Sequence, residues 1–499
     1  MSSDGPARRV IAVAPMPPEK SAYALARYSR SPDSIEDSIR WVHAHSSEKF
    51  WEQFYFAYGH ASIADLGHVI VCFEHISELA AIRLEDEPLW DGQAKSSRYQ
   101  NFAPSGSYVP ESILGTETEG LYRGILGSLS NAYRLLHEPL MRVLAERAPR
   151  PADMKDAEYQ RTIAARAFDV TRYLLPLAVR TNVGQVVSIR TLEKQITRLL
   201  SSPLPELRAI GEDLRDACQR PPMNLWGELS GQPAGLADPV APTLARHAAP
   251  NAYQAEVYTD LLRYTREVLK AHGLDQPSAW APPGGTGDPV DLIPPHHPLD
   301  ELTTTLLYRA SHVPYRRLLA MVTEWNEKRK RDTVEVALRK RGPYDDLIKE
   351  FRSGYAFIFD ILMDIGGWRD LHRHRRCQQI QQNFTTLHGY DVPPALREAG
   401  LDRDYCAAME AVKSDIERLR PIHQEAALYA IPFGFKVRCL FKMDYAEAEY
   451  IARLRSGVKG HWSYRTVAWA MRQKMAEAHP FLADQIKATP PDVEDTLAR

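Results

Sequence analysis

Cysteine is scarce in this 499-residue chain, and neither sign of charge dominates it. The five cysteines are odd in number and form no Cys-x-x-Cys pair, so the sequence supports neither a disulfide framework nor a zinc knuckle. Lys and Arg total 62 against 64 Asp and Glu, so we expect no general attraction to nucleic acid or to an anionic membrane.

Long apolar runs are also missing. No stretch of about 18 apolar residues occurs, and no charged segment followed by an apolar one opens the chain. We therefore expect neither a membrane span nor a secretory signal, and a reducing cytoplasm suits the unpaired cysteines.

Proline and glycine, by contrast, are concentrated in one part of the chain, from about Pro221 to Pro298. A single helical stretch, YQAEVYTDLLRYTREVLKAHG, interrupts this region. The length of the chain favours two domains. We therefore predict a first domain over residues 1–222, a linker containing one helix over 223–298 and a second domain over 299–499.

The two flanks of the linker resemble each other. VIVCFEHISELAAIR at 69–83 aligns with YAFIFDILMDIGGWR at 355–369, an offset of 286 residues, and 173–190 aligns with 429–446 at an offset of 256. Amphipathic helices follow both of the later segments. This order of landmarks indicates a tandem duplication with 30 extra residues in the first copy. We expect an α/β (α+β) fold in which each copy is a sheet packed with helices, and in which each early strand is buried and runs into a basic loop.

Positive charge is packed into one turn of the second copy, HRHRRC, which begins at His372. A guanidinium is a planar fork that matches a phosphate or the edge of an electron-rich ring. Arg373 and Arg375, on either side of His374, therefore suit an anionic ligand. A solvated basic loop is the alternative, and the neutral net charge disfavours an RNA-binding or nuclear-localisation segment.

These motifs together resemble the flavin-dependent thymidylate synthases. The resemblance rests on YGHASIAD at 58–65, Arg-His-Arg at 373–375, SSRY at 96–99 and ARLRSGVKGHWSYRTVAWAM at 452–471. It covers two units, residues 20–218 and 299–481.

The resemblance implies a function. Members of this family bind FAD and dUMP, take a methylene group from methylenetetrahydrofolate and reduce the product with hydride from NADPH. No protein cysteine attacks the uracil, so none of the five cysteines needs a catalytic role. Because the family works as a tetramer with sites between subunits, the resemblance implies a homodimer of this chain that acts as a pseudo-tetramer.

Each copy departs from the family pattern in a different place. The second copy keeps Arg-His-Arg but has Asn-Phe-Thr-Thr (383–386) where Ser-x-Arg-Tyr is expected. The first copy keeps Ser-x-Arg-Tyr but has Asp-Glu-Pro-Leu (86–89) where Arg-His-Arg is expected. Two further family positions, an acidic residue and a glutamine, are Ala94 and Asp370 here. The losses are complementary, so we predict composite sites built from both copies; the alternative is that both copies drifted after losing catalysis.

The resemblance assigns roles to individual residues. Those implied in catalysis are Arg373, Arg375 and Arg455. Those implied in cofactor binding are Arg373, His374, Arg375, His60 and Arg190. Those implied in substrate binding are Ser96, Arg98, Tyr99 and Arg455. No metal site is expected, because His43 and His296 lack further ligands at a recognisable spacing. The alternatives are a flavoprotein that acts on another pyrimidine nucleotide and a non-catalytic nucleotide-binding paralogue.

Overall fold

A computed structural model describes the chain apart from residues 1–10, 12, 14, 30, 32–33, 58–60, 226–228, 230, 232–237, 281–287, 294–297, 342–347, 352–356, 485, 496 and 498–499. The chain divides into two compact units. Unit 1 comprises Met1–Cys72, Leu89–Gln93 and Gly184–Asn251, and unit 2 comprises Phe73–Pro88, Ala94–Val183 and Ala252–Arg499. In the part of the chain that is described, no helix is both long and apolar enough to cross a membrane.

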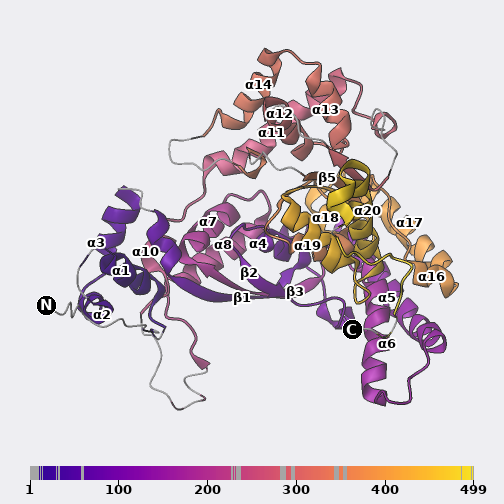
Figure 1. The fold of residues 1–499 in the computed structure, drawn as a ribbon, viewed down its shortest axis with the longest axis horizontal. Helices are drawn as coiled ribbons and strands as arrows, with labels where there is room; N and C mark the ends of the chain where they lie inside the picture. Colours follow the sequence, from indigo (N-terminus) through magenta and orange to yellow (C-terminus); the bar gives the residue numbers. More distant parts are fainter. Residues whose placement is uncertain are drawn as a thin grey trace. The chain divides into compact units, whose positions relative to one another are not determined.

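Helices dominate both units, and Figure 1 shows their course along the chain. Those of unit 1 are α1 (Pro18–Tyr28), α2 (Ile35–Ala44), α3 (Glu48–Phe50), the π-helix η1 (Trp51–Ala57), the 3₁₀ helix η2 (Ala61–Leu66), α7 (Ile189–Leu200), α8 (Pro205–Cys218) and α10 (Pro242–His247). The α-helices of unit 2 are α4 (Glu78–Glu85), α5 (Glu119–Arg147), α6 (Asp156–Thr171), α11 (Ala252–Ala271), α12 (Pro298–Arg309), α13 (Tyr315–Thr323), α14 (Glu327–Leu338), α15 (Ile365–His372), α16 (Pro394–Glu398), α17 (Asp402–Leu419), α18 (Gln424–Tyr429), α19 (Tyr445–Ser456), α20 (Trp462–Ala478) and α21 (Pro480–Asp484). Its short 3₁₀ helices are η3 (Ala103–Ser105), η4 (Glu111–Ile113), η5 (Arg172–Leu174), η6 (Pro277–Ala279) and η7 (Lys349–Phe351).

Two small sheets confirm the mixed α and β fold that the sequence predicts. One contains β1 (His68–Ser77), β2 (Asp91–Ala94) and β3 (Arg180–Ser188) in the order β1-β3-β2. The other contains β4 (Val290–Ile293), β5 (Phe357–Asp364), β6 (Gln378–Gln381) and β7 (Lys436–Met443) in the order β4-β5-β7-β6, with every neighbouring pair antiparallel. Apart from β4, the second sheet repeats the order of the first, as expected of a tandem duplication.

Helix caps fix the alignment of the repeats. At the end of four strands, a residue in or just after the strand has a side-chain oxygen that accepts from the backbone N–H three residues on, and this caps the following helix. The four are Ser77 before α4, Asp364 before α15, Ser188 before α7 and Asp444 before α19. The first two caps are 287 residues apart and the last two are 256 apart. The early segments are therefore related by an offset of 287 residues and not by the predicted 286. A shift of one residue between two apolar segments still pairs apolar residues with apolar residues, so the sequence does not reveal it.

The two repeats pair with each other in unit 2 through residues 173–178 and 429–434. Pro176 lies opposite Pro432 in an antiparallel bridge. Backbone N–H groups donate across it to carbonyls of the other repeat, from Leu177 to Ile431 (3.0 Å), Phe433 to Leu175 (3.0 Å), Ala178 to Tyr429 (2.8 Å) and Gly434 to Tyr173 (2.9 Å). Each bond has its counterpart with the repeats exchanged, so an approximate two-fold axis relates these segments.

The extra residues of the first repeat lie in its helical hairpin. In the second repeat the hairpin consists of α17, which has 18 residues, and α18, which has 6. In the first it consists of α5 with 29 residues and α6 with 16, which lie side by side in Figure 1. The insertion therefore lengthens existing helices.

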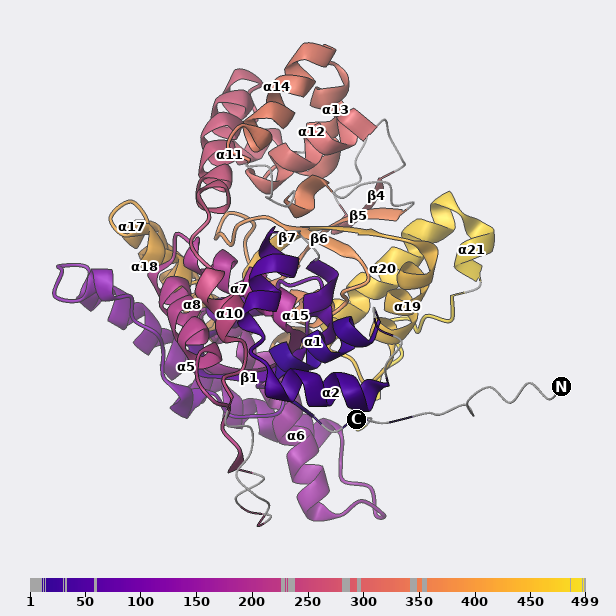
Figure 2. The same ribbon diagram turned by 90° about the vertical axis from the view of Figure 1, so that its left-hand side faces the viewer.

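Buried apolar residues surround the second sheet. Helices α11, α12 and α13 bury one cluster against it, which includes Leu269, Leu307, Leu318, Ile358 and Leu440. Helices α15 and α20 also pack on β5, which is why this strand is apolar along almost its whole length. Figure 2 shows α19 and α20 side by side next to this sheet.

Some sequence expectations need correction. Strands β1 and β5 run into helices α4 and α15 and not directly into loops. The turn after α15 is basic, whereas the turn after α4 is acidic. Strand β1 is largely exposed, whereas β5 is buried. Within the region expected as a linker, α11 packs on α12 and α14, and β4 pairs with β5. Because the compact units cut across the repeats, the domain boundaries at 222 and 298 stay a prediction.

Candidate functional site

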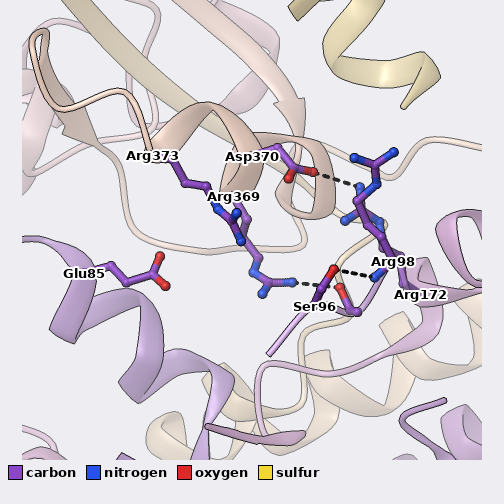
Figure 3. A pocket seen from close by; sticks show the side chains of 8 residues that line it. Glu85, Ser96, Arg98, Arg172, Arg369, Asp370 and Arg373 are labelled. Carbon is purple, nitrogen blue, oxygen red and sulfur yellow. Dashed lines mark hydrogen bonds and ion pairs between the residues drawn. The ribbon is translucent and has the colours of Figure 1, made fainter. Parts of the chain in front are cut away.

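A pocket in unit 2 lies between the two repeats and is lined mainly by arginines. Its cavity volume is about 10 Å³, enough for about one water molecule, so the lining side chains nearly close it. We call it the arginine pocket; its lining residues are Glu85, Ser96, Ser97, Arg98, Arg172, Arg369, Asp370 and Arg373. Figure 3 shows the first repeat supplying Ser96, Arg98 and Arg172 and the second supplying Arg369, Asp370 and Arg373.

Arg98 is held by a carboxylate of its own repeat. Its Nε donates to Oδ1 of Asp169 at 2.8 Å and its Nη2 to Oδ2 at 2.9 Å, a bidentate pair in which both side chains are largely buried. Its third nitrogen, Nη1, donates to the hydroxyl of Tyr464 at 3.0 Å. Burial acts to lower the pKa of Arg98, but Asp169, Tyr464 and Asp370 together raise it. Arg98 thus reaches the pocket as a fixed cation.

A second arginine bridges two carboxylates. Nη2 of Arg172 donates to Oδ2 of Asp370 at 3.2 Å, and its Nε lies 3.4 Å from Oδ1 of Asp169. Burial acts to raise the pKa of Asp370, but Arg172, Arg98 and Arg373 together hold that pKa below its ordinary value. Asp370 therefore remains a carboxylate and acts only as a hydrogen-bond acceptor.

Arg369 joins the two repeats at the pocket wall. Its Nη2 lies 2.6 Å from Oε1 of Glu78, and its Nη1 donates to the hydroxyl of Ser97 at 3.1 Å. Burial raises the pKa of Glu78 to about 7, although Arg369 opposes this shift. Figure 3 also shows the carboxylate of Glu85, from α4, directed toward the Arg369 and Arg373 side chains.

His374 is buried next to the pocket turn. Nε of Arg455 donates to its Nε2 at 2.7 Å, so Nε2 is the acceptor and Nδ1 carries the proton toward Oε1 of Glu447 at 3.2 Å. Burial lowers the pKa of His374, which leaves this ring neutral at pH 7. The guanidinium of Arg455 also lies over the ring of Tyr464, 5.6 Å from its centroid. Tyr464 thus connects Arg455 with Arg98.

Sequence reasoning missed a buried chain of polar side chains behind the pocket. Nδ1 of His461 lies 3.3 Å from Oδ2 of Asp169, and its Nε2 lies 2.8 Å from the hydroxyl of Tyr173. Burial acts to raise the pKa of Asp169, but His461, Arg98 and Arg172 hold it well below its usual range. Tyr173 and His461 lie in segments that the sequence analysis quotes, but nothing in those segments identifies Asp169 or the contacts among the three, because the partners lie far apart in sequence.

The structure brings some predicted residues together and separates others. Ser96, Arg98 and Arg373 line one pocket, and the two repeats of one chain suffice to form it. Arg455 and His374 contact each other beside it. Tyr99 is exposed under the guanidinium of Arg98, whose carbon lies 5.6 Å from the ring centroid.

The remaining predicted residues lie elsewhere. Arg375 is half-buried and is not among the lining residues. Arg190 belongs to unit 1, where its Nη1 lies 2.8 Å from Oδ2 of Asp65. His60 falls outside the described residues.

If the two repeats are exchanged, each pocket residue corresponds to an equivalent residue in the other repeat. These equivalent residues differ from the pocket residues in charge and in hydrogen bonding. Asp86, the counterpart of Arg373, accepts from Nζ of Lys349 at 2.7 and 2.9 Å. Thr385 stands where the first repeat has Arg98, and Thr386 accepts from Nη2 of Arg420 at 2.8 Å. These second positions are therefore occupied by contacts within the protein, and among the described residues only one of the two related places carries the arginine cluster.

No group of three or more His, Cys, Asp or Glu side chains is arranged to hold a metal ion in the described part of the chain. The arginine pocket thus offers guanidinium and hydroxyl groups, which bind anionic oxygen atoms. Arg172 and Arg369 also line the pocket, although the sequence motifs do not indicate them. A sequence signal for Arg369 exists, since Arg369 lies on α15 only four residues before Arg373, which caps that helix.

Comparison with known proteins gives the family. Residues 10–221 and 308–481 match the family described as thymidylate synthase complementing protein. A UPF0159 protein of Chlamydia pneumoniae is 24% identical over 86% of this chain and 78% of its own length. A UPF0159 protein of Thermoplasma acidophilum is 23% identical over 93% and 94%.

Solved structures of thymidylate synthase X from Helicobacter pylori with FAD and dUMP are also similar. One is 17% identical with a TM-score of 0.26 and covers 41% of this chain and 89% of its own. The other is 18% identical with a TM-score of 0.23 and covers 39% and 99%. These scores are too low to carry an argument, and the assignment rests on the two sequence matches, which span most of the chain. The chain therefore belongs to the family of thymidylate synthase complementing proteins, the flavin-dependent thymidylate synthases, and carries the family's sequence twice.

Proposed function

We propose that this protein catalyses the FAD-dependent reductive methylation of dUMP to dTMP, with methylenetetrahydrofolate as the carbon donor and NADPH as the reductant. One observation carries the proposal. Ser96 and Arg98, which the first repeat retains, line the same pocket as Arg373, which the second repeat retains. Drift of both repeats after loss of catalysis gives no reason for complementary motif halves to share one pocket.

The chemistry of the pocket suits a nucleotide phosphate. Arg373 is exposed at its mouth, and Ser96 adds a hydroxyl that donates to anionic oxygen. Two of the three nitrogens of Arg98 donate to Asp169. Arg98 therefore contributes mainly a fixed positive charge, and its guanidinium is not available for a bidentate contact with the phosphate. A charged hydrogen bond is worth about 1.5–3 kcal/mol, so Arg373 alone has a measurable effect on affinity.

The residues present fit a flavin in part. Arg373 and Arg375 lie on one turn after α15, and positive charge there favours an anionic cofactor. When bound, FAD would supply the hydride transfer that no side chain of this chain performs. His374 stays neutral between Glu447 and Arg455 and holds the turn in place. The proposed homodimer would add the surfaces that a single chain lacks.

The first test is the colour of the purified protein. A flavin absorption spectrum, or one that FAD restores, supports the proposal. The second test is growth of a thymidine-requiring strain that expresses this chain. Growth supports dTMP synthesis, and its loss in Arg373→Ala with retention in Arg376→Ala ties the activity to the pocket. Arg376 is a matched control because it is exposed on the same turn and does not line the pocket.

A second candidate has a specific observation in its favour. Asp370 lines the pocket where the family pattern has a glutamine, and its carboxylate only accepts hydrogen bonds. An acceptor suits a ring edge that presents an amino group, as cytosine does. A flavoprotein acting on another pyrimidine nucleotide is therefore the alternative, and tighter binding of dCMP than of dUMP would favour it. A colourless protein that FAD does not reconstitute would instead favour a non-catalytic nucleotide-binding role.

A further inference from the structure

A second pocket in unit 2 shares no residue with the arginine pocket. It lies where the end of α11 meets α13 and the start of α14, and Figures 1 and 2 show these helices in one group. Its cavity volume is about 490 Å³, and its mouth is open to solvent. That volume is within the range of pockets that hold small organic molecules. Neither the family motifs nor the proposed reaction uses it.

The floor of this pocket is an indole with an unused donor. Trp325 is only 7% exposed and belongs to the apolar core between the helices and the sheet. Its Nε1–H has no acceptor among the described residues. Buried donors are usually paired in folded proteins, so an unpaired donor beside a pocket is a group that a bound acceptor would satisfy.

Two guanidinium groups stand around the indole. Nε of Arg317 is buried and has no acceptor in the described part of the chain. The guanidinium of Arg329 lies over the Trp325 ring, with its carbon 4.2 Å from the centroid. The one carboxylate in the pocket wall belongs to the exposed Glu324. Cationic donors therefore outnumber acceptors, and the pocket favours an anion.

Apolar groups form the rest of the wall. Leu274 is buried, and Ala320 and Met321 are partly buried beside it. The ring of His272 lies 5.6 Å from that of Trp325. Burial and the charge of Arg329 lower the pKa of His272, so this ring is uncharged at pH 7. These surfaces suit a flat ring, because aromatic faces and thioethers pack well against one another.

We propose that this pocket binds a small molecule that carries an anionic oxygen group, phosphate or carboxylate, on a flat ring. The anionic oxygens accept from the guanidinium of Arg317, and from Nε1–H of Trp325 once the bound group shifts the side chains that cover this buried atom. The ring lies against Met321 and Leu274. Two donors without an acceptor and an apolar wall that fits a ring occur together beside this pocket, and ligand sites combine a few polar groups with such a wall in the same way.

The test is calorimetric titration of the full chain with phenyl phosphate and with benzoate. Both probes carry a ring, and the comparison shows whether phosphate or carboxylate is preferred. We expect Arg317→Met to weaken binding of the preferred probe about tenfold, as loss of a charged hydrogen bond does. Trp325→Phe keeps the ring and removes the donor, so a smaller loss, about threefold, is expected. Arg331→Met is the matched control, since Arg331 is exposed on α14 and pairs with Glu327.

A second measurement uses the unmodified protein, so it does not depend on how a variant folds. Phenylglyoxal modifies accessible arginines, and peptide mass spectrometry reports the sites. The bound probe is expected to protect Arg317 and Arg329 but not Arg331. Titration of Arg373→Ala separates any binding in the arginine pocket, and we expect its affinity for the probe at this second site to be unchanged. No binding of either probe at about 10 mM, or unchanged binding in both pocket variants, would overturn the proposal.

Discussion

Arg98 and Asp169 form a bidentate ion pair, with nitrogen to oxygen distances of 2.8 and 2.9 Å, at the inner end of a pocket that both repeats build. Arg98 comes from a motif that the second repeat has lost. The carboxylate of Asp169 contacts three side chains, those of Arg98, Arg172 and His461. The pair fixes a positive charge in the pocket wall.

Loss of Arg98 is expected to destabilise the protein. Arg98→Ala leaves the buried carboxylate of Asp169 without its bidentate partner, and breaking a buried pair in this way costs about 3–5 kcal/mol. His461 and Arg172 remain, so the lower part of that range is expected. Urea unfolding measures the change. The double variant Arg98→Ala/Asp169→Ala is expected to lose less than the sum of the two single variants. Additive losses would mean that the two side chains do not interact.

Two equivalent glycines are expected to behave alike. Gly106 and Gly389 have φ of 70° and 69°, and each carbonyl accepts from the first residue of a strand, Arg180 or Lys436. A Cβ meets no atom within 4 Å at either place, so alanine adds only backbone strain. Each Gly→Ala substitution is expected to cost about 1–3 kcal/mol in urea unfolding.

A helical glycine provides the control for that pair. Gly124 is exposed inside α5 and also has open space around it, so Gly124→Ala is expected to stabilise the protein by about 0.5–1 kcal/mol. A large difference between Gly106→Ala and Gly389→Ala would contradict the equivalence of the repeats.

Acid is expected to destabilise unit 2 through two neighbouring histidines. The rings of His312 and His388 lie 5.7 Å apart. Burial lowers the pKa of His312 to about 4 and that of His388 to about 3, and Arg420, Arg438 and Lys436 add to these shifts. Both folded pKa values lie below the unfolded value of about 6.5. The unfolded state therefore binds protons that the folded state does not, and stability falls as pH drops below 6.5.

The size of this effect follows from the linkage. Between pH 6.5 and 5, each histidine is expected to remove about 2 kcal/mol from the free energy of unfolding. In His312→Phe the difference between urea unfolding at the two pH values should shrink by about that amount. The exposed His43 serves as the control, and His43→Gln should leave the difference as it is. An unaltered difference in His312→Phe would show that this ring is not the responsive group.

Parts of this architecture were visible in the sequence. The repeat landmarks predicted the strands before α4 and α15, and the complementary motifs predicted that Ser96 and Arg98 would share a site with Arg373. The three do line one pocket, while their roles remain predictions. The alignment was one residue off because apolar runs specify burial but not register.

Other parts were not visible, for a physical reason. The partners of Arg98 lie 71 and 366 residues away, at Asp169 and Tyr464, and pairings of that kind depend on tertiary packing. The exposure of β1 could not be predicted from its sequence either. A strand can have the same apolar composition whether or not helices cover it. Glu78 gives no sign that Arg369 of the other repeat is its partner.

The central claim is that both repeats of one chain build a single nucleotide site. Calorimetric titration of the purified protein with dUMP tests it most directly, in the unmodified chain, Arg98→Lys, Arg373→Ala and the control Arg376→Ala. The account predicts one dUMP per chain, affinity about tenfold or more weaker in Arg98→Lys and in Arg373→Ala, and no change in Arg376→Ala. Two equivalents of dUMP per chain, or weakening in only one of the two pocket variants, would contradict it.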